Sequence, residues 1–207
     1  MNTSNNQKTV RPQRHLQLGI DPDRIPVFFE LLRSGFSADL TVGCNLEHLL
    51  CNQLNIAPDY LRNRVQTVFL NNSPLDDLAS TAVPDGAVIS LSAAMPGLNG
   101  AVMRKGGPLA ELRRSISHSP EEVCSQPLPG RITLKLFNLV AKELGPQFLA
   151  RGIVVNSKAL DELFKRQTPN FWQGVKSIEI DGSRGRIDEL ILHEWPEQEV
   201  MFQVQPG

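Results

Sequence analysis

The sequence predicts an α+β protein made of two tandem units, each a mixed sheet crossed by one helix. Two observations predict this class. Stretches of alternating apolar residues, typical of strands, and stretches with helical apolar spacing follow one another in the same order in both halves of the chain. In addition, the 207 residues suffice for two compact units of about 80 residues, each with a modest core of its own.

The first half begins with residues 1–13, which are polar and offer little apolar surface, so we expect a disordered tail. The next stretches, "HLQLGI" and "ADLTVG", alternate as two short strands do. Between them, "PVFFELLRSGF" has a mixed period that favours no single element. A helix is then predicted from the spacing of Leu46, Leu49 and Leu50, which places one apolar stripe against a core.

Two further strands complete the first half. The stretch "VQTVFLNN" predicts a strand that enters a turn at Asn71–Asn72, because asparagine tolerates positive φ. The stretch "GAVISLSAAM" follows the turn signal Pro84-Asp85-Gly86 and predicts the last strand of this half.

The second half repeats this order. Its stretches "RITLKLFN", "GIVVN", "SKALDELFKRQ", "KSIEIDG" and "EVMFQVQPG" predict strand, strand, helix, strand and strand. With one constant offset, Asn71–Asn72 falls on Asp181–Gly182, and Pro96–Gly97 falls on Pro206–Gly207. The agreement in element type, order and turn residues indicates an internal repeat.

Each predicted helix has a candidate for its N-cap. In the first helix this is Asn45 or Cys44, and in the second it is Ser157. The second helix turns its apolar residues inward, and these are Leu160, Leu163 and Phe164.

Strand, strand, helix, strand and strand within about 80 residues is the order of the β-grasp, or ubiquitin-like, fold, whose helix buries one face of a sheet. We therefore predict two tandem β-grasp units at residues 14–97 and 131–207. Residues 98–130 form the linker between them, and the prolines of "SPEEVCSQPLPG" mark its end.

Three segments, "TVGCNLEHLL", "VFLNN" and "DGAVISLSAAMPG", resemble the ubiquitin-like sulfur-carrier family, the MoaD/ThiS-like proteins of molybdopterin and thiamine synthesis. The resemblance covers residues 36–107 and, more faintly, residues 131–207. It implies a chain that ends in a diglycine, whose carboxylate an enzyme adenylates and converts to a thiocarboxylate. The implied partner is an adenylating enzyme or a component of a molybdenum or tungsten enzyme.

The diglycine of this chain, Gly106–Gly107, departs from that family pattern because it is internal. The chain ends in Pro206–Gly207 instead, where a rigid proline replaces the first glycine. Sulfur carriage would therefore require cleavage after Gly107. The other interpretation is a linker, in which Gly106 and Gly107 turn the chain and Pro108 begins a short helix.

We expect residues 97–107 to be an ordered linker with Met95 and Leu98 as apolar anchors at its base. Leu109 and Leu112 would dock the short helix that follows onto one of the units. The same segment is the candidate for partner binding, where Met95 and Leu98 offer apolar surface and Arg104 and Lys105 would touch an acidic partner.

Composition and charge exclude several function classes. The formal net charge of −1 gives no field that would hold nucleic acid or an anionic membrane. No apolar stretch approaches the roughly 18 residues of a membrane span. The three cysteines, Cys44, Cys51 and Cys124, are an odd number in a chain without an apolar leader, so we expect a reduced, cytoplasmic protein.

Candidates for catalysis or metal binding are few. Cys44, His48 and Cys51 have the spacing of one helix face and offer a zinc site, but three ligands on one helix leave a tetrahedral site incomplete. We find no nucleotide-binding glycine motif and no nucleophile elbow. The sequence therefore predicts a non-enzymatic accessory or interaction module without a cofactor, the alternatives being a sulfur carrier cleaved after Gly107 and a zinc-binding protein.

Overall fold

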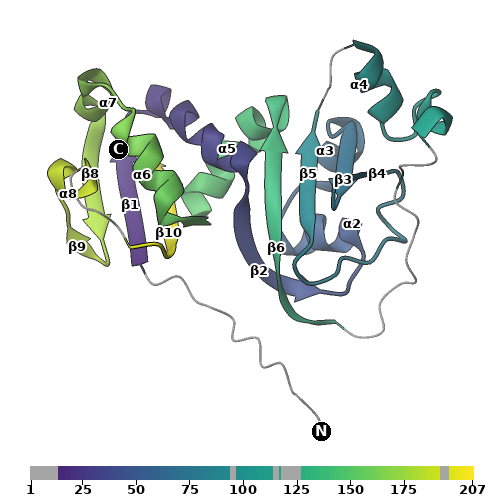
Figure 1. Cartoon of the computed structure of the whole chain (residues 1–207), viewed down its shortest axis with the longest axis horizontal. Helices are drawn as coiled ribbons and strands as arrows, with labels where there is room; N and C mark the ends of the chain where they lie inside the picture. Colours follow the sequence, from purple (N-terminus) through teal and green to yellow (C-terminus); the bar gives the residue numbers. More distant parts are fainter. Residues whose placement is uncertain (1–13, 94–96, 114–116, 118–126, 192–195) are drawn as a thin grey trace, which may run out of the picture.

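The computed structural model describes residues 14–93, 97–113, 117, 127–191 and 196–207 (Figure 1). Within these ranges, ten strands form one open mixed sheet, accompanied by eight α-helices. The predicted α+β class is confirmed.

The strands are β1 (Arg14–Ile20), β2 (Phe36–Val42), β3 (Thr67–Leu70), β4 (Ser73–Leu75), β5 (Val88–Ser92), β6 (Leu128–Phe137), β7 (Ile153–Asn156), β8 (Val175–Ile180), β9 (Ser183–Arg184) and β10 (Glu199–Pro206). The α-helices are α1 (Phe29–Ser34), α2 (Leu46–His48), α3 (Pro58–Asn63), α4 (Gly97–Met103), α5 (Asn138–Arg151), α6 (Ser157–Lys165), α7 (Pro169–Gln173) and α8 (Ile187–Ile191). Three further helical turns are η1 (Pro22–Phe28), η2 (Leu49–Gln53) and η3 (Ala110–Arg113).

The sheet is nearly divided at its middle. Its strand order is β4-β3-β5-β6-β2-β7-β10-β1-β8-β9. Among the described residues, β2 and β7 share one bridge, Ser37–Val154, whereas the other neighbours pair over several residues or form hairpins. We call the five strands from β4 to β2 half sheet A and the five from β7 to β9 half sheet B, and Figure 1 shows them as two lobes.

Both half sheets have the same plan. Counted from the junction outward, the first strand is antiparallel to the second, the second is parallel to the third, and the third is antiparallel to the fourth. The fourth strand forms a hairpin with a short edge strand. The hairpin turns Asn71–Asn72 and Asp181–Gly182 have positive φ at both residues, as the sequence predicted. The two half sheets therefore share strand directions and turns, but the first and last strands of the repeats trade places. Counted from the junction, the second and third strands are β6 and β5 in half sheet A but β10 and β1 in half sheet B.

The tandem arrangement, in contrast, is not confirmed. We expected two separate sheets, and the structure has one, in which the first strand of each repeat lies among strands of the other. Strand β1 lies between β10 and β8 in half sheet B, and β6 lies between β5 and β2 in half sheet A. Each of the predicted units, residues 14–97 and 131–207, thus contributes strands to both half sheets.

Helices connect the first and second strands of each repeat, where the sequence pattern predicted no element. The chain passes from β1 to β2 through η1 and α1, and from β6 to β7 through α5. The helices end at Gly35 and Gly152, whose φ values of +114° and +99° favour glycine. A Cβ added at Gly145 of α5 would lie 2.8 Å from Leu32 Cδ1 of α1, so the two connecting helices pack closely.

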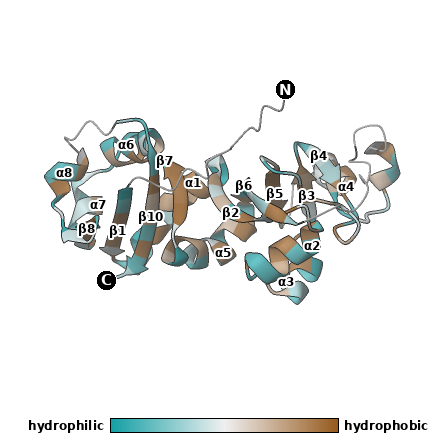
Figure 2. Cartoon of the chain, turned by 90° about the horizontal axis from the view of Figure 1, so that it is seen from below, coloured by the Kyte–Doolittle hydropathy of each residue, from teal (hydrophilic) through white to brown (hydrophobic). Residues whose placement is uncertain are grey.

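The helices cover opposite faces of the sheet in its two halves (Figure 2). Helix α5 lies beside α3, where Arg64 pairs with Glu143. On the other face, α1 lies near the end of α6, where Glu30 accepts a hydrogen bond from Arg166 at 2.8 Å. Each half sheet therefore has one face covered by its own helices and one face that they leave open.

The predicted helix stripes are confirmed as core. All six side chains are at most 2% exposed: Leu46, Leu49, Leu50, Leu160, Leu163 and Phe164. Asn45 caps its helix as predicted, since its Oδ1 accepts from His48 N at 2.7 Å. The prediction for Ser157 is wrong. Asn156 is the N-cap there, and the buried Ser157 hydroxyl donates to the carbonyl of Pro196 instead.

Candidate functional site

The diglycine lies in a turn, residues 104–107, that is hydrogen-bonded to half sheet A near the ends of the β3–β4 hairpin. Lys105 N donates to the carbonyl of Gln66 at 2.7 Å, and Gly106 N donates to Asp76 Oδ1 at 2.9 Å. The Arg104 guanidinium donates to Gln66 Oε1 at 2.7 and 3.1 Å. We call these residues the diglycine turn.

Both glycines suit this turn for physical reasons. Gly106 has a φ of +60°, in the left-handed region that glycine adopts without penalty. A Cβ on Gly107 would lie 3.1 Å from the carbonyl oxygen of Arg104, which also accepts a hydrogen bond from Gly107 N. The predicted reversal of the chain at Gly106 is thus observed.

The side chain of Lys105 is half-buried against the body of half sheet A. Its Nζ donates to the carbonyl of Leu61 at 3.2 Å, and burial lowers the pKa of Lys105 although Glu47 and Asp76 raise it. The surrounding depression, of about 470 Å³, includes Arg62 as well as these two carboxylates. Lys105 therefore anchors the turn to half sheet A, and the hydrogen bonds from Arg104 to Gln66 add to this anchoring.

Large apolar side chains are exposed just before and after this turn. Helix α4 packs against η3, and Leu98 and Leu112 are 72% and 71% exposed. The predicted anchoring by Leu98 and docking by Leu112 are therefore wrong, while Val102, Met103 and Leu109 are half-buried. Met95 lies outside the described residues. We call Leu98 and Leu112 the leucine pair.

The three candidate zinc ligands are not brought together. Cys44 precedes the helix, and its Sγ donates to the carbonyl of Thr41 at 3.3 Å. His48 is exposed, and beyond it the helix widens to a π-helical turn, Leu49–Gln53, which displaces Cys51 from the expected face. Burial raises the pKa of the half-buried Cys51 thiol. The described ranges contain no cluster of three side chains placed to hold a metal ion.

Sequence reasoning missed a pair of depressions on the open faces. The one on half sheet A has about 300 Å³ and is lined by uncharged residues, including Phe69, Phe137 and Asn138. The one on half sheet B has about 410 Å³ and includes Gln17 and Glu179. Phe69 and Glu179 hold the same place in the repeat, two residues before the hairpin turn. The two depressions thus lie at corresponding places on the two half sheets, but the one on half sheet A is lined by uncharged residues and the one on half sheet B includes a carboxylate.

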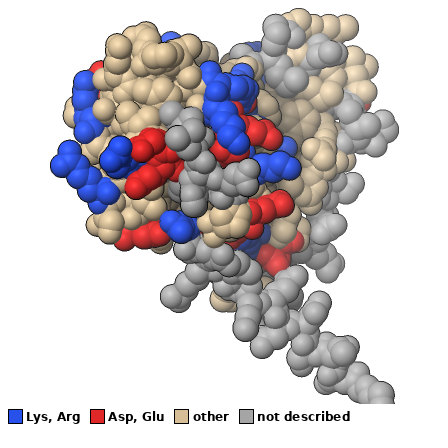
Figure 3. All heavy atoms as spheres, turned by 60° about the vertical axis from the view of Figure 1, so that its left-hand side comes forward, with Lys and Arg blue, Asp and Glu red and all other residues tan. Residues whose placement is uncertain are grey.

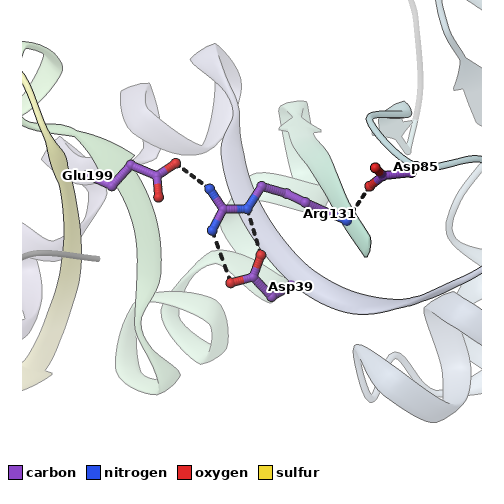
Figure 4. A network of polar contacts seen from close by, with 4 residues as sticks. All are labelled: Asp39, Asp85, Arg131 and Glu199. Atoms are coloured by element: carbon purple, nitrogen blue, oxygen red, sulfur yellow. Dashed lines mark hydrogen bonds and ion pairs between the residues drawn. The ribbon is translucent and has the colours of Figure 1, made fainter. Parts of the chain in front are cut away.

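An ion-pair network joins the two half sheets (Figure 4). Arg131 of β6 donates to both carboxylate oxygens of Asp39 in β2, at 2.6 and 3.0 Å, and also pairs with Glu199 of β10. Its backbone N–H donates to Asp85 at 2.7 Å. These bonds, first those to Asp39, raise the pKa of Arg131. The network holds β6 to strands of both half sheets, and within the described residues the second carboxylate oxygen of Glu199, Oε2, is buried without a hydrogen-bond donor.

The visible charges do not form a field of one sign. Figure 3 shows Lys and Arg side chains interspersed with Asp and Glu on the end of the molecule nearest half sheet B. In the described ranges, no helix has the length and apolar content needed to cross a bilayer.

No family model, curated protein or solved structure matches the chain. The leucine pair, which flanks the diglycine turn in the chain, is more exposed than the other large apolar side chains of the described residues.

Proposed function

We propose that the chain is a non-enzymatic accessory module with two ubiquitin-like half sheets that binds a larger protein partner. The observation that carries the proposal is the exposure of Leu98 and Leu112 on helices that pack together. Two large apolar side chains exposed to water favour association, because a partner that covers them removes apolar surface from solvent. The odd number of cysteines is compatible with a cytoplasmic location, which is part of the proposal.

The diglycine turn supports this function by holding the leucine pair in place. Its hydrogen bonds to Gln66, Asp76 and Leu61 fix the chain between α4 and η3. A surface that is ordered before binding loses less conformational entropy when a partner docks. Arg104 and Lys105 thus serve the binding surface by positioning it.

The ubiquitin-like part of the proposal rests on the shared plan of the half sheets. Each has five strands with the same directions, and each is covered on one face by the helix that follows its junction strand, α2 in half sheet A and α6 in half sheet B. We propose that both derive from one β-grasp ancestor of the sulfur-carrier type by duplication and exchange of first strands. In this proposal β1 also moved from the place that corresponds to β6, between β7 and β10, to its place between β10 and β8.

Sulfur carriage after cleavage at Gly107 is the alternative, and two observations count against it. The tail would have to leave the hydrogen bonds that Lys105 and Gly106 make with half sheet A. The bond to be cut is also a tertiary amide, because Pro108 follows Gly107. An adenylating enzyme would be the partner in this alternative, and a larger protein complex, such as a molybdenum or tungsten enzyme, is a candidate in either case.

Photocrosslinking from single positions tests the proposal. A benzophenone amino acid replaces Leu98, Leu112 or, as the matched control, Leu139, which is 41% exposed on α5. In the native host we expect one discrete protein adduct from positions 98 and 112 and none from position 139. Mass spectrometry then identifies the partner, and the Leu98→Ser/Leu112→Ser variant should lose its complex. If no adduct forms at either position, or if all three positions give the same adducts, the proposal fails.

A further inference from the structure

We infer that the two repeats are obligate partners: each completes the half sheet of the other with its first strand, so the protein stays one particle when the connection between β5 and β6 is cut. We define the first repeat as residues 14–113 and the second as residues 127–207. The inference rests on strand order and burial, and it does not depend on the proposed function.

Strand β1 belongs to the first repeat but is surrounded by the second. It pairs in parallel with β10 along its whole length, from Arg14–Val200 to Ile20–Pro206, and antiparallel with β8 on its other side. Its inward side chains, Leu16, Leu18 and Ile20, are at most 1% exposed. Among the described strands, only β1 connects β10 with β8, so half sheet B would separate into two pieces without it.

Strand β6 shows the reciprocal arrangement. It belongs to the second repeat and lies between β5 and β2 of the first, paired in parallel with β5 and antiparallel with β2. Its inward side chains, Ile132, Leu134 and Leu136, are at most 1% exposed. Without β6, β2 would keep its single bridge to β7 but lose its connection to β5, and half sheet A would also divide.

Other contacts between the repeats reinforce this exchange. Glu143 of the second repeat accepts hydrogen bonds from Tyr60 at 2.7 Å and from Arg64 Nε at 3.0 Å. Arg131 of the second repeat pairs with Asp39 of the first. The connecting helices α1 and α5, one from each repeat, also pack against each other.

The chain therefore consists of two repeats that exchange their first strands, although β6 is the second and β1 the third strand of its half sheet when counted from the junction. The connection between the repeats passes through α4, the diglycine turn and η3, which lie outside both half sheets. Cleavage in this connection, at Gly107 or beyond, would create a new carboxyl terminus on the first repeat without releasing it from the second.

Cutting the intact protein tests the first part of the inference. A specific protease site replaces residues 119–125, and the purified protein is cut to completion. Native mass spectrometry and gel filtration at micromolar concentration should show one particle near the uncut mass of 22.9 kDa, with two chains on a denaturing gel. Two separate particles under native conditions would overturn the inference.

Engineered disulfides test the exchange itself, in a background where Cys44, Cys51 and Cys124 are serine. The register places Gln17 beside Gln203 and Ser90 beside Lys135, each pair on adjacent parallel strands whose spacing of about 4.8 Å permits a disulfide. Oxidation of either cysteine pair should link the two chains of the cut protein covalently.

The matched control pairs Gln17→Cys with Ser90→Cys. These positions lie in different half sheets here, but in tandem units with unexchanged first strands they would lie on the same sheet. We expect this control to keep two free thiols. Efficient oxidation of the control, or failure of both exchanged pairs to link the chains, would overturn the inference even if the cut protein remained one particle.

Discussion

Truncation of Leu134 in β6 separates the exchanged arrangement from a tandem one. Leu134 is fully buried and register-paired with Phe36 of β2 and Ile89 of β5, both in half sheet A. Removal of a buried leucine side chain to alanine costs about 2–5 kcal/mol, because apolar burial is lost and a cavity remains. Even 2 kcal/mol raises the population of the opened state about 30-fold.

Hydrogen exchange with peptide-level mass spectrometry measures where this cost falls. In Leu134→Ala we expect the amides of β3 and β5 to exchange about 30-fold faster or more than in the unmodified protein. Their acceleration should be at least as large as that of the amides of β8 and β10. The matched control is Leu98→Ala, whose exposed side chain should change stability by less than about 0.5 kcal/mol.

A different outcome would refute the reasoning. In a tandem arrangement, β6 would belong to the sheet of β8 and β10, and the variant would accelerate exchange there while leaving β3 and β5 unchanged. That pattern would show that Leu134 packs in half sheet B.

Three more predictions concern acid, backbone geometry and metal. Hydrogen bonds from Arg64 and then Tyr60 lower the pKa of Glu143 from 4.5 to about 2, so the stability they supply is present above pH 4.5 and is lost as the pH falls toward 2. The melting temperature should decline over this window, and Glu143→Gln should flatten part of that decline. Equal slopes of melting temperature against pH in the two proteins would contradict the assignment. Gly35→Ala should destabilise by more than about 1 kcal/mol in chemical denaturation, because φ is +114° and the new Cβ would lie 2.9 Å from Thr133 Cγ2. The control Gly182→Ala, also at positive φ but with open space around it, should cost less, and the reverse ranking would contradict the packing at Gly35. Protein purified without chelator should carry no stoichiometric zinc by inductively coupled plasma analysis; bound zinc that disappears in Cys44→Ser would contradict the geometry of the α2 region.

Local patterns made much of the fold predictable from the sequence. Alternation located the strands, and helical spacing located the stripes of α2 with η2 and of α6, because burial on one face imposes a period on the residues themselves. The positive φ at Asn71–Asn72 and Asp181–Gly182 followed from residue types that tolerate it.

Strand neighbours were not predictable in the same way. Alternation states which side chains of β1 and β6 face inward, but either strand fits any sheet with a matching apolar face. The sequence does contain a signal for the connection that makes the exchange possible. Buried residues of α5 recur at helical spacing, with Val140, Leu144 and Phe148 among them, although Pro146 lies within the helix.

The candidate site was predictable only in part. Turn geometry at Gly106 followed from glycine's access to positive φ, but the hydrogen bonds to Gln66 and Asp76 depend on the tertiary fold. Leu98 was expected to be buried because it is apolar, yet α4 is short and extends from the sheet, so packing rather than residue type decides which face meets solvent.

The central claim is that the diglycine is a structural turn of an intact interaction module rather than a chemical tail. Intact-mass spectrometry of the protein isolated from its native host tests this claim most directly. The account predicts an uncut chain in which Gly107 is still joined to Pro108. A species that ends at Gly107 and carries sulfur in place of one carboxylate oxygen would contradict it and identify a sulfur carrier.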